Sequence, residues 1–105
     1  MVGLTSGAIR HTVVFRLGHP EGSDAERSFL EAAAALAAIP GVEAFEILDE
    51  VGAKNDDRYG ISMEFADRAA YEAYNGHPDH VRFVEERWLP EVAEFLEIDY
   101  APRSA

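Results

Sequence analysis

The run His77-Pro78-Asp79-His80-Val81 places two of the chain's four histidines within one helical turn of each other. Histidine is the only side chain whose unperturbed pKa puts its change of charge near neutral pH, so a close pair invites a chemical interpretation. A partly buried imidazole beside a phenol can act as a general acid or base. What the pair can do therefore depends on which element holds the run and which residues face it.

Composition limits the classes of function. The chain has 105 residues, the length of one ordinary domain, which we expect to span residues 8–102. The absence of cysteine excludes a disulfide framework, a thiolate zinc site and a cysteine nucleophile, and is compatible with a cytoplasmic location. The formal net charge of −11 should repel nucleic-acid phosphates and anionic lipid surfaces, so we expect neither nucleic acid nor a membrane as a partner. We also expect no signal peptide and no membrane-spanning stretch.

Alternation of apolar and polar side chains predicts the strands. They are expected at residues 9–17, 42–51, 59–65 and 95–100. In the first strand, His11 interrupts an otherwise apolar face. In the second, Phe45, Ile47 and Val51 are expected to share one face.

A first helix is predicted from the capping box Ser23-Asp24-Ala25-Glu26 to Ala38, and Pro40-Gly41 is expected to stop it. Its many alanines favour helix formation. The expected buried stripe consists of Phe29, Ala33, Leu36 and Ala37.

Two further helices are predicted after the third strand. Asp67 is a good N-cap for a short helix on which Tyr71 and Tyr74 share one side. Another helix begins at His77-Pro78, because the missing N–H of proline costs little in a first turn. The expected apolar stripe of this helix consists of Val81, Phe83, Val84 and Trp88.

The order of elements predicts the fold class. After Pro90, which is expected to interrupt the last helix, the final strand completes a strand, helix, strand, strand, helix, strand order. This is the split βαβ pattern of an α+β, ferredoxin-like domain. One sheet face would stay uncovered and would carry Thr12, Val14 and Leu48. Such a face is too apolar to be left in water. We therefore expect two protomers to stack these faces in a symmetric homodimer.

Four segments together resemble the stress-responsive A/B barrel family. They are the first strand Ile9-Arg10-His11-Thr12-Val13-Val14-Phe15, the turn Ile39-Pro40-Gly41-Val42, residues 59–67, and residues 74–83 with their HPxHVxF pattern. The resemblance covers residues 9–102 and implies a dimeric α+β barrel built from two ferredoxin-like βαββαβ protomers. Most members have no established activity. The best understood is a plant polyketide cyclase that closes a linear polyketide by aldol condensation without a cofactor.

The resemblance to that cyclase also implies site residues. The histidine of its first strand, its helix tyrosine and the second histidine of its HPxH run fall on His11, Tyr74 and His80. A further pocket histidine of the cyclase aligns with Tyr59 here, so the same substrate is not implied.

The residues themselves are consistent with such a pocket. His80 and His11 could serve as general base or acid, and the Tyr74 hydroxyl could stabilise an enolate. No cofactor and no metal is expected. The side chains expected to contact a small apolar carbonyl substrate are Tyr59, Phe29, Met63 and Phe83.

Each candidate also has a structural interpretation. His11 could be a core histidine that hydrogen-bonds the helix above it, and Tyr74 could be an ordinary amphipathic core residue. His77 is interpreted mainly as a helix-start residue, and His19 as a solvated loop residue. A metal shared by the two close histidines and Asp79 or Asp99 is a weaker interpretation, because the usual zinc pairing on a helix is i, i+4 and these histidines are at i, i+3.

Three functions stay open from the sequence. The first is a cofactor-free cyclase, lyase or isomerase of a small carbonyl compound. The second is a non-catalytic module that binds a small hydrophobic ligand in the same pocket. The third is a structural dimer whose pocket is filled.

Overall fold

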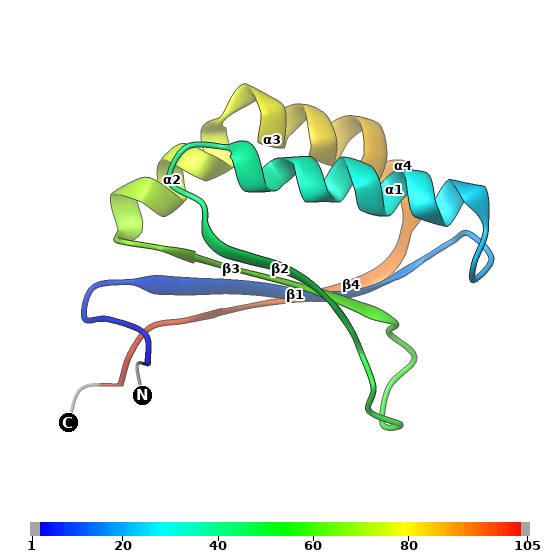
Figure 1. Ribbon diagram of the computed structural model, residues 1–105, viewed down its shortest axis with the longest axis horizontal. Coiled ribbons are helices and arrows are strands. Elements are labelled where there is room, and N and C mark those ends of the chain that lie inside the picture. Colours follow the sequence, from blue (N-terminus) through cyan, green and yellow to red (C-terminus); the bar gives the residue numbers. More distant parts are fainter. Residues whose placement is uncertain (1–2, 104–105) are drawn as a thin grey trace.

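The computed structural model describes residues 3–103 as a four-stranded antiparallel sheet with its helices on one face (Figure 1). The strands are β1 (Ile9–Leu17), β2 (Glu43–Asp49), β3 (Tyr59–Phe65) and β4 (Val92–Tyr100), in the order β2-β3-β1-β4. The predicted ferredoxin-like βαββαβ fold is confirmed. No helix among the described residues is long and apolar enough to cross a membrane.

The helices begin where the sequence places their caps. They are α1 (Asp24–Ala34), continued by the 3₁₀ segment η1 (Ala35–Ala38), then α2 (Arg68–Gly76), α3 (Pro78–Phe83), the π-helical segment η2 (Val84–Trp88) and α4 (Leu89–Glu91). Ser23 accepts a hydrogen bond from the Glu26 N–H at 3.2 Å, and Asp67 accepts one from the Ala70 N–H at 2.8 Å. The Glu26 carboxylate accepts from the Gly22 N–H at 2.9 Å, one residue earlier than a standard capping box.

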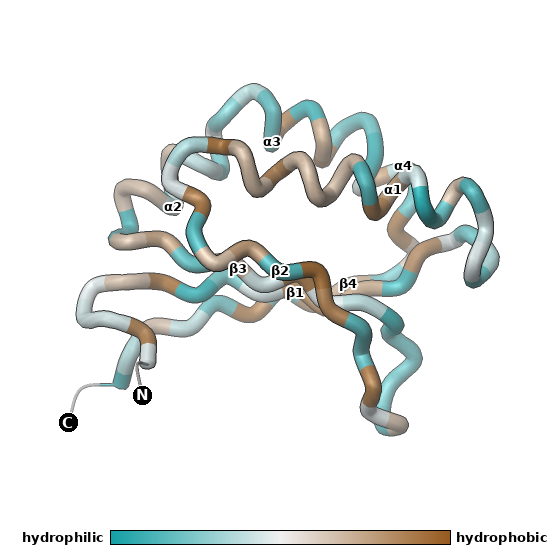
Figure 2. The backbone as a smooth tube through the Cα atoms, in the orientation of Figure 1, coloured by the Kyte–Doolittle hydropathy of each residue, from teal (hydrophilic) through white to brown (hydrophobic). Residues whose placement is uncertain are grey.

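The core lies between the helices and the inward face of the sheet. The largest fully buried side chains are Phe15, Phe29, Met63, Phe65 and Tyr74. In Figure 2, hydrophobic positions recur along α1 and the sheet, and hydrophilic positions are common on the outer turns of α3. Within residues 3–103, no helix covers the other sheet face (Figure 1).

Two predicted core positions on the first helix and second strand are wrong. Ala37 is exposed, because η1 winds with about three residues per turn and directs Leu36 and Ile39 inward instead. Val51 is 92% exposed. A bulge between Glu43 and Glu46, where Ala44 has a positive φ of 49°, precedes a strand that ends at Asp49, so Val51 falls in the hairpin loop.

The last helical stretch also differs from its prediction. Pro90 does not interrupt it: the Leu89 N–H makes a π-type bond to the Val84 carbonyl, and the helix runs on to Glu91. The π-helical register turns Phe83 and Trp88, five residues apart, toward the core. Val81, on α3, is 40% exposed, which differs from its predicted place in the apolar stripe.

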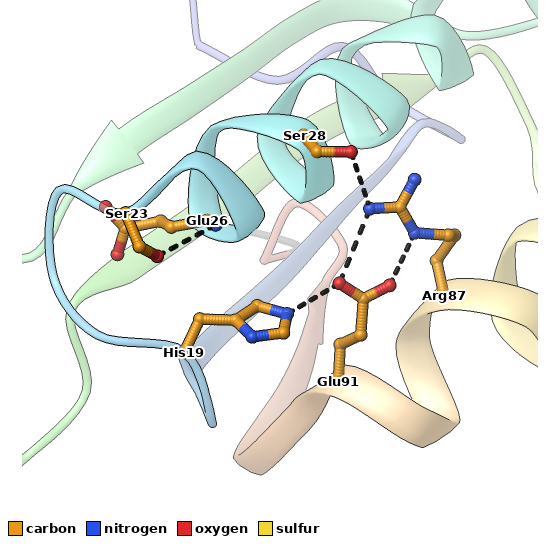
Figure 3. A network of polar contacts seen from close by, with 6 residues as sticks. All are labelled: His19, Ser23, Glu26, Ser28, Arg87 and Glu91. Atoms are coloured by element: carbon orange, nitrogen blue, oxygen red, sulfur yellow. Dashed lines mark hydrogen bonds and ion pairs between the residues drawn. The ribbon is translucent and has the colours of Figure 1, made fainter.

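A polar network joins this helical stretch to α1 and to the loop after β1 (Figure 3). His19 was expected to be solvated, yet its Nε2 lies 2.7 Å from Glu91 Oε1. The Arg87 guanidinium also pairs with Glu91 and donates to Ser28 Oγ on α1 at 3.1 Å. The hydrogen bond from Arg87 is the main reason that the Glu91 pKa is lowered from its ordinary value. The network therefore ties the loop after β1, α1 and α4 together.

Candidate functional site

A cavity of about 270 Å³ lies between the sheet and the helices. Its lining includes His11, Tyr74 and His80, so the structure places the three predicted catalytic side chains around one space. Its other polar lining residues are Asn75 and Glu97. The volume is slightly below the roughly 300 Å³ at which pockets for drug-sized ligands begin, so it suits a small molecule.

His11 is held by a carboxylate from the neighbouring strand. It is only 7% exposed, and the register of β1 and β4 places it directly opposite Asp99. Its Nδ1 lies 2.6 Å from Asp99 Oδ1. Since a carboxylate only accepts hydrogen bonds, this contact favours the imidazole form with hydrogen on Nδ1, which leaves Nε2 with a free lone pair.

Tyr71 completes this group from α2. Its hydroxyl donates to Asp99 Oδ2 at 2.8 Å and lies 3.1 Å from His11 Nδ1. Burial is the main cause that raises the Tyr71 pKa, followed by its bond to Asp99. The phenol therefore stays protonated and acts as a donor that fixes the carboxylate.

His80 is held by the backbone instead. Its Nδ1 donates to the Asn75 carbonyl at 3.1 Å, which again leaves Nε2 as the basic nitrogen. Burial lowers the His80 pKa below its ordinary value of 6.5, so the ring is uncharged at neutral pH. A neutral, oriented imidazole of this kind can accept a proton.

Tyr74 lies between the two histidines. Its ring centroid is 4.4 Å from that of His80 and 6.4 Å from that of His11. It is 2% exposed, and burial raises the pKa of its hydroxyl. The hydroxyl therefore remains a hydrogen-bond donor over the physiological pH range.

The predicted substrate-contacting residues divide into two pairs. Met63 and Phe83 line the cavity. Phe29 and Tyr59 do not, which corrects the expectation for both. Phe29 packs against the core aromatics Phe15, Phe83 and Trp88, and Tyr59 packs against Phe15 at the other end of the strand pair.

The sequence did not predict three polar residues of this region as part of the pocket. Asp99 and Tyr71 hold His11, and Glu97 lines the cavity from the same strand face as Asp99. The alternation of Phe95, Glu97 and Asp99 was the available signal, because it puts all three on one face of the last strand. Phe95, on the same strand face, is half-exposed and also lines the cavity.

Each histidine of the close pair uses its Nδ1 in a local hydrogen bond. His77 Nδ1 accepts from the Asp79 N–H at 3.1 Å, which is the cap role predicted for it. The corresponding nitrogen of His80 is bonded to the Asn75 carbonyl. Among residues 3–103 there is no group of three or more His, Cys, Asp or Glu side chains that could hold a metal ion.

Known proteins resemble this chain over nearly its whole length. The stress responsive A/B barrel domain matches residues 9–102. A Dabb family protein with a ferredoxin-like fold from Mesorhizobium loti is 56% identical, with 94% of this chain and 100% of that chain covered and a TM-score of 0.91. No curated protein matches the sequence.

Two more distant structures share the fold. A dimeric ferredoxin-like protein of unknown function from Thermobifida fusca is 24% identical, with 97% of each chain covered and a TM-score of 0.76. A hydroxynitrile lyase from Passiflora edulis is 14% identical, with 96% of this chain and 98% of that chain covered and a TM-score of 0.83. At these identities the likeness shows the fold alone.

Proposed function

Because this chain belongs to the stress responsive A/B barrel domain family, we propose that its cavity binds a small carbonyl compound and catalyses cofactor-free proton transfer at the carbon beside the carbonyl. Such a step begins a cyclase, lyase or isomerase reaction. The observation that carries the proposal is that His11, Tyr74 and His80 border one mostly apolar cavity. A fold shared with a hydroxynitrile lyase supports the class of reaction only by analogy.

In the proposed step, His80 Nε2 takes the proton as the C–H bond breaks. The electron pair moves into an enolate, and the Tyr74 hydroxyl donates a hydrogen bond to the enolate oxygen. The enolate then either attacks a second carbonyl carbon or regains a proton at another position. The imidazolium of His80 returns its proton, so the protein ends unchanged.

His11 has a second acid–base role in this proposal. Its Nδ1 is engaged by Asp99, so Nε2 can exchange a proton with the substrate oxygen or with water in the cavity. Asp99 and Tyr71 are positioning residues, because they act through His11.

The experiment is hydrogen–deuterium exchange of ketones in D₂O, followed by loss of the C–H signals in proton NMR spectra. A panel of small aryl and alkyl ketones is incubated with the wild type, His80→Gln, Tyr74→Phe and the control His19→Gln, which lies outside the cavity. A positioned acid or base contributes on the order of 100-fold or more, so we expect exchange to fall at least that much in His80→Gln and to persist in His19→Gln. Exchange that survives in His80→Gln overturns the assignment.

The second candidate function is a non-catalytic binding module. The mostly apolar lining of the cavity favours it as much as it favours an enzyme. Quenching of Trp88, the single tryptophan and a lining residue, would report ligand binding. Saturable quenching by a ketone that shows no exchange identifies this second function.

The same proposal includes a homodimer and a cytoplasmic location. The dimer is supported by the uncovered sheet face and by the dimeric ferredoxin-like protein of the same fold. The location rests on the absence of cysteine.

A further inference from the structure

The cavity lining contains one carboxylate, that of Glu97, and, apart from two imidazoles, no basic side chain of residues 3–103. His80 adds no charge at neutral pH, because burial lowers its pKa. An anionic ligand would therefore enter this cavity without a cationic partner, at a cost in desolvation.

Glu97 is also unusual among the acidic residues around it. Glu91 is bonded to Arg87, Glu94 to Arg16, and Asp99 to His11. Within the described part of the chain, Glu97 forms no ion pair and no side-chain hydrogen bond. The strand register places it opposite Val13, between Phe95 and Asp99 on the helix-facing side of β4.

Aromatic side chains line the same space. Trp88, Phe95 and Tyr74 all line the cavity, and the Trp88 and Phe95 rings meet edge to face at 5.4 Å. Aromatic faces attract cations through their quadrupole, and tryptophan does so most strongly. A free carboxylate beside several aromatic rings is a chemical environment that suits an organic ammonium group.

From these observations we propose that the cavity prefers ligands with an apolar body and a protonated nitrogen, and that Glu97 confers this preference. This inference rests on the proposed function and narrows its substrate class to carbonyl compounds that carry an amine or a basic ring nitrogen. A polyketide-like substrate with a free carboxylate would be disfavoured.

The test compares three probes of nearly equal shape: 2-phenylethylamine, 2-phenylethanol and phenylacetate. Binding is followed by Trp88 fluorescence, excited where the probes do not absorb, in wild type and Glu97→Gln. For an exposed carboxylate we expect the amine to bind on the order of fivefold more tightly than the alcohol, and phenylacetate to bind most weakly. In Glu97→Gln the amine and the alcohol should bind equally.

Two further variants control the test. Glu97→Asp keeps the charge and should keep the preference for the amine. Glu31→Gln removes one negative charge from the exposed outer side of α1 and should also leave the preference intact. Circular dichroism spectra verify that each variant is folded.

The outcomes separate the two proposals. Equal binding of the three probes, or tightest binding of phenylacetate, overturns the charge preference while leaving the ligand site in place. A preference for the amine that persists in Glu97→Gln overturns the role of Glu97. The absence of a saturable response to any probe overturns the ligand site itself and this inference with it.

Discussion

At the scale of single residues, the two imidazoles of the cavity differ in what holds them. His11 faces a carboxylate and a phenol, whereas His80 faces a neutral backbone carbonyl. The ionised partner gives His11 the more strongly fixed ring, since charge-assisted hydrogen bonds are about twice as strong as neutral ones. His80, with no charged partner, is the imidazole better suited to begin a reaction as a neutral base.

The bond between Tyr71 and Asp99 can be measured as a coupling free energy. Tyr71→Phe keeps the ring that stacks on Phe65 and removes only the hydroxyl. We expect Tyr71→Phe, Asp99→Asn and the double variant to give a coupling of about 1 kcal/mol in free energies of unfolding from urea titrations, since Asp99 is partly solvated. Additive effects of the two substitutions would show that the bond adds nothing to stability.

The His80 pKa predicts a pH dependence of stability. The folded-state pKa lies below the value of 6.5 expected for the unfolded chain, so the unfolded chain binds the proton more readily. The stabilising effect of the neutral ring is complete above that value and is lost as the pH falls below it.

We therefore expect the free energy of unfolding to fall more in wild type than in His80→Gln between about pH 7.5 and about pH 5.5. Urea unfolding at both pH values measures the difference. A parallel fall in the two proteins would mean that His80 is solvated in the folded state.

The sequence predicted part of this residue-level arrangement. Strand alternation placed His11 on the helix-facing side of the sheet, but the grouping of His11, Tyr74 and His80 came from the resemblance to the family's cyclase; all three line the cavity. The partnership of His11 with Asp99 joins residues 88 positions apart. This partnership depends on which strands pair and in which register, and local sequence patterns do not determine strand pairing.

At the scale of elements, local signals succeeded where one periodicity holds throughout. The bounds of β1 and β3 match their predictions because both strands alternate without a break. The predictions failed where the period changes: in η1, at the bulge of β2, and in η2. These changes respond to tertiary packing, so the sequence alone did not reveal them.

The turn between η1 and β2 depends on one glycine. Gly41 has a φ of 90°, and a Cβ added there would meet Ala70 only at an ordinary contact distance of 3.6 Å. The cost of Gly41→Ala is therefore conformational, and we expect a loss of about 1–2 kcal/mol in the free energy of unfolding. Gly76→Ala is the matched control, because its Cβ would meet nothing within 4 Å and its φ is not positive. A loss of equal size in both variants would contradict this explanation.

At the scale of the whole molecule, the two faces of the sheet differ in how they are covered. One face is covered by the helices and encloses the cavity, and the other is left bare by the part of the chain that the structure describes (Figure 1). Large apolar side chains nevertheless point out from the bare face, chiefly from β4, and they are Leu48, Leu96, Ile98 and Tyr100. Contiguous apolar surface of this kind marks an interaction site.

A symmetric dimer would bury this bare face, because the same patch can pair with itself about a two-fold axis. Leu96, which is 57% exposed and pairs with Val14 in the sheet, lies within the patch. We expect light scattering after size-exclusion chromatography to give wild type twice the 11.6 kDa mass of the chain, and to give Leu96→Lys the mass of one chain. A lysine there would be buried without a partner in the dimer but solvated in the monomer. The control variant Val81→Lys should stay dimeric, because Val81 lies on the helix layer that covers the opposite face. A monomeric wild type would mean that the apolar side chains of the bare face contact a different partner.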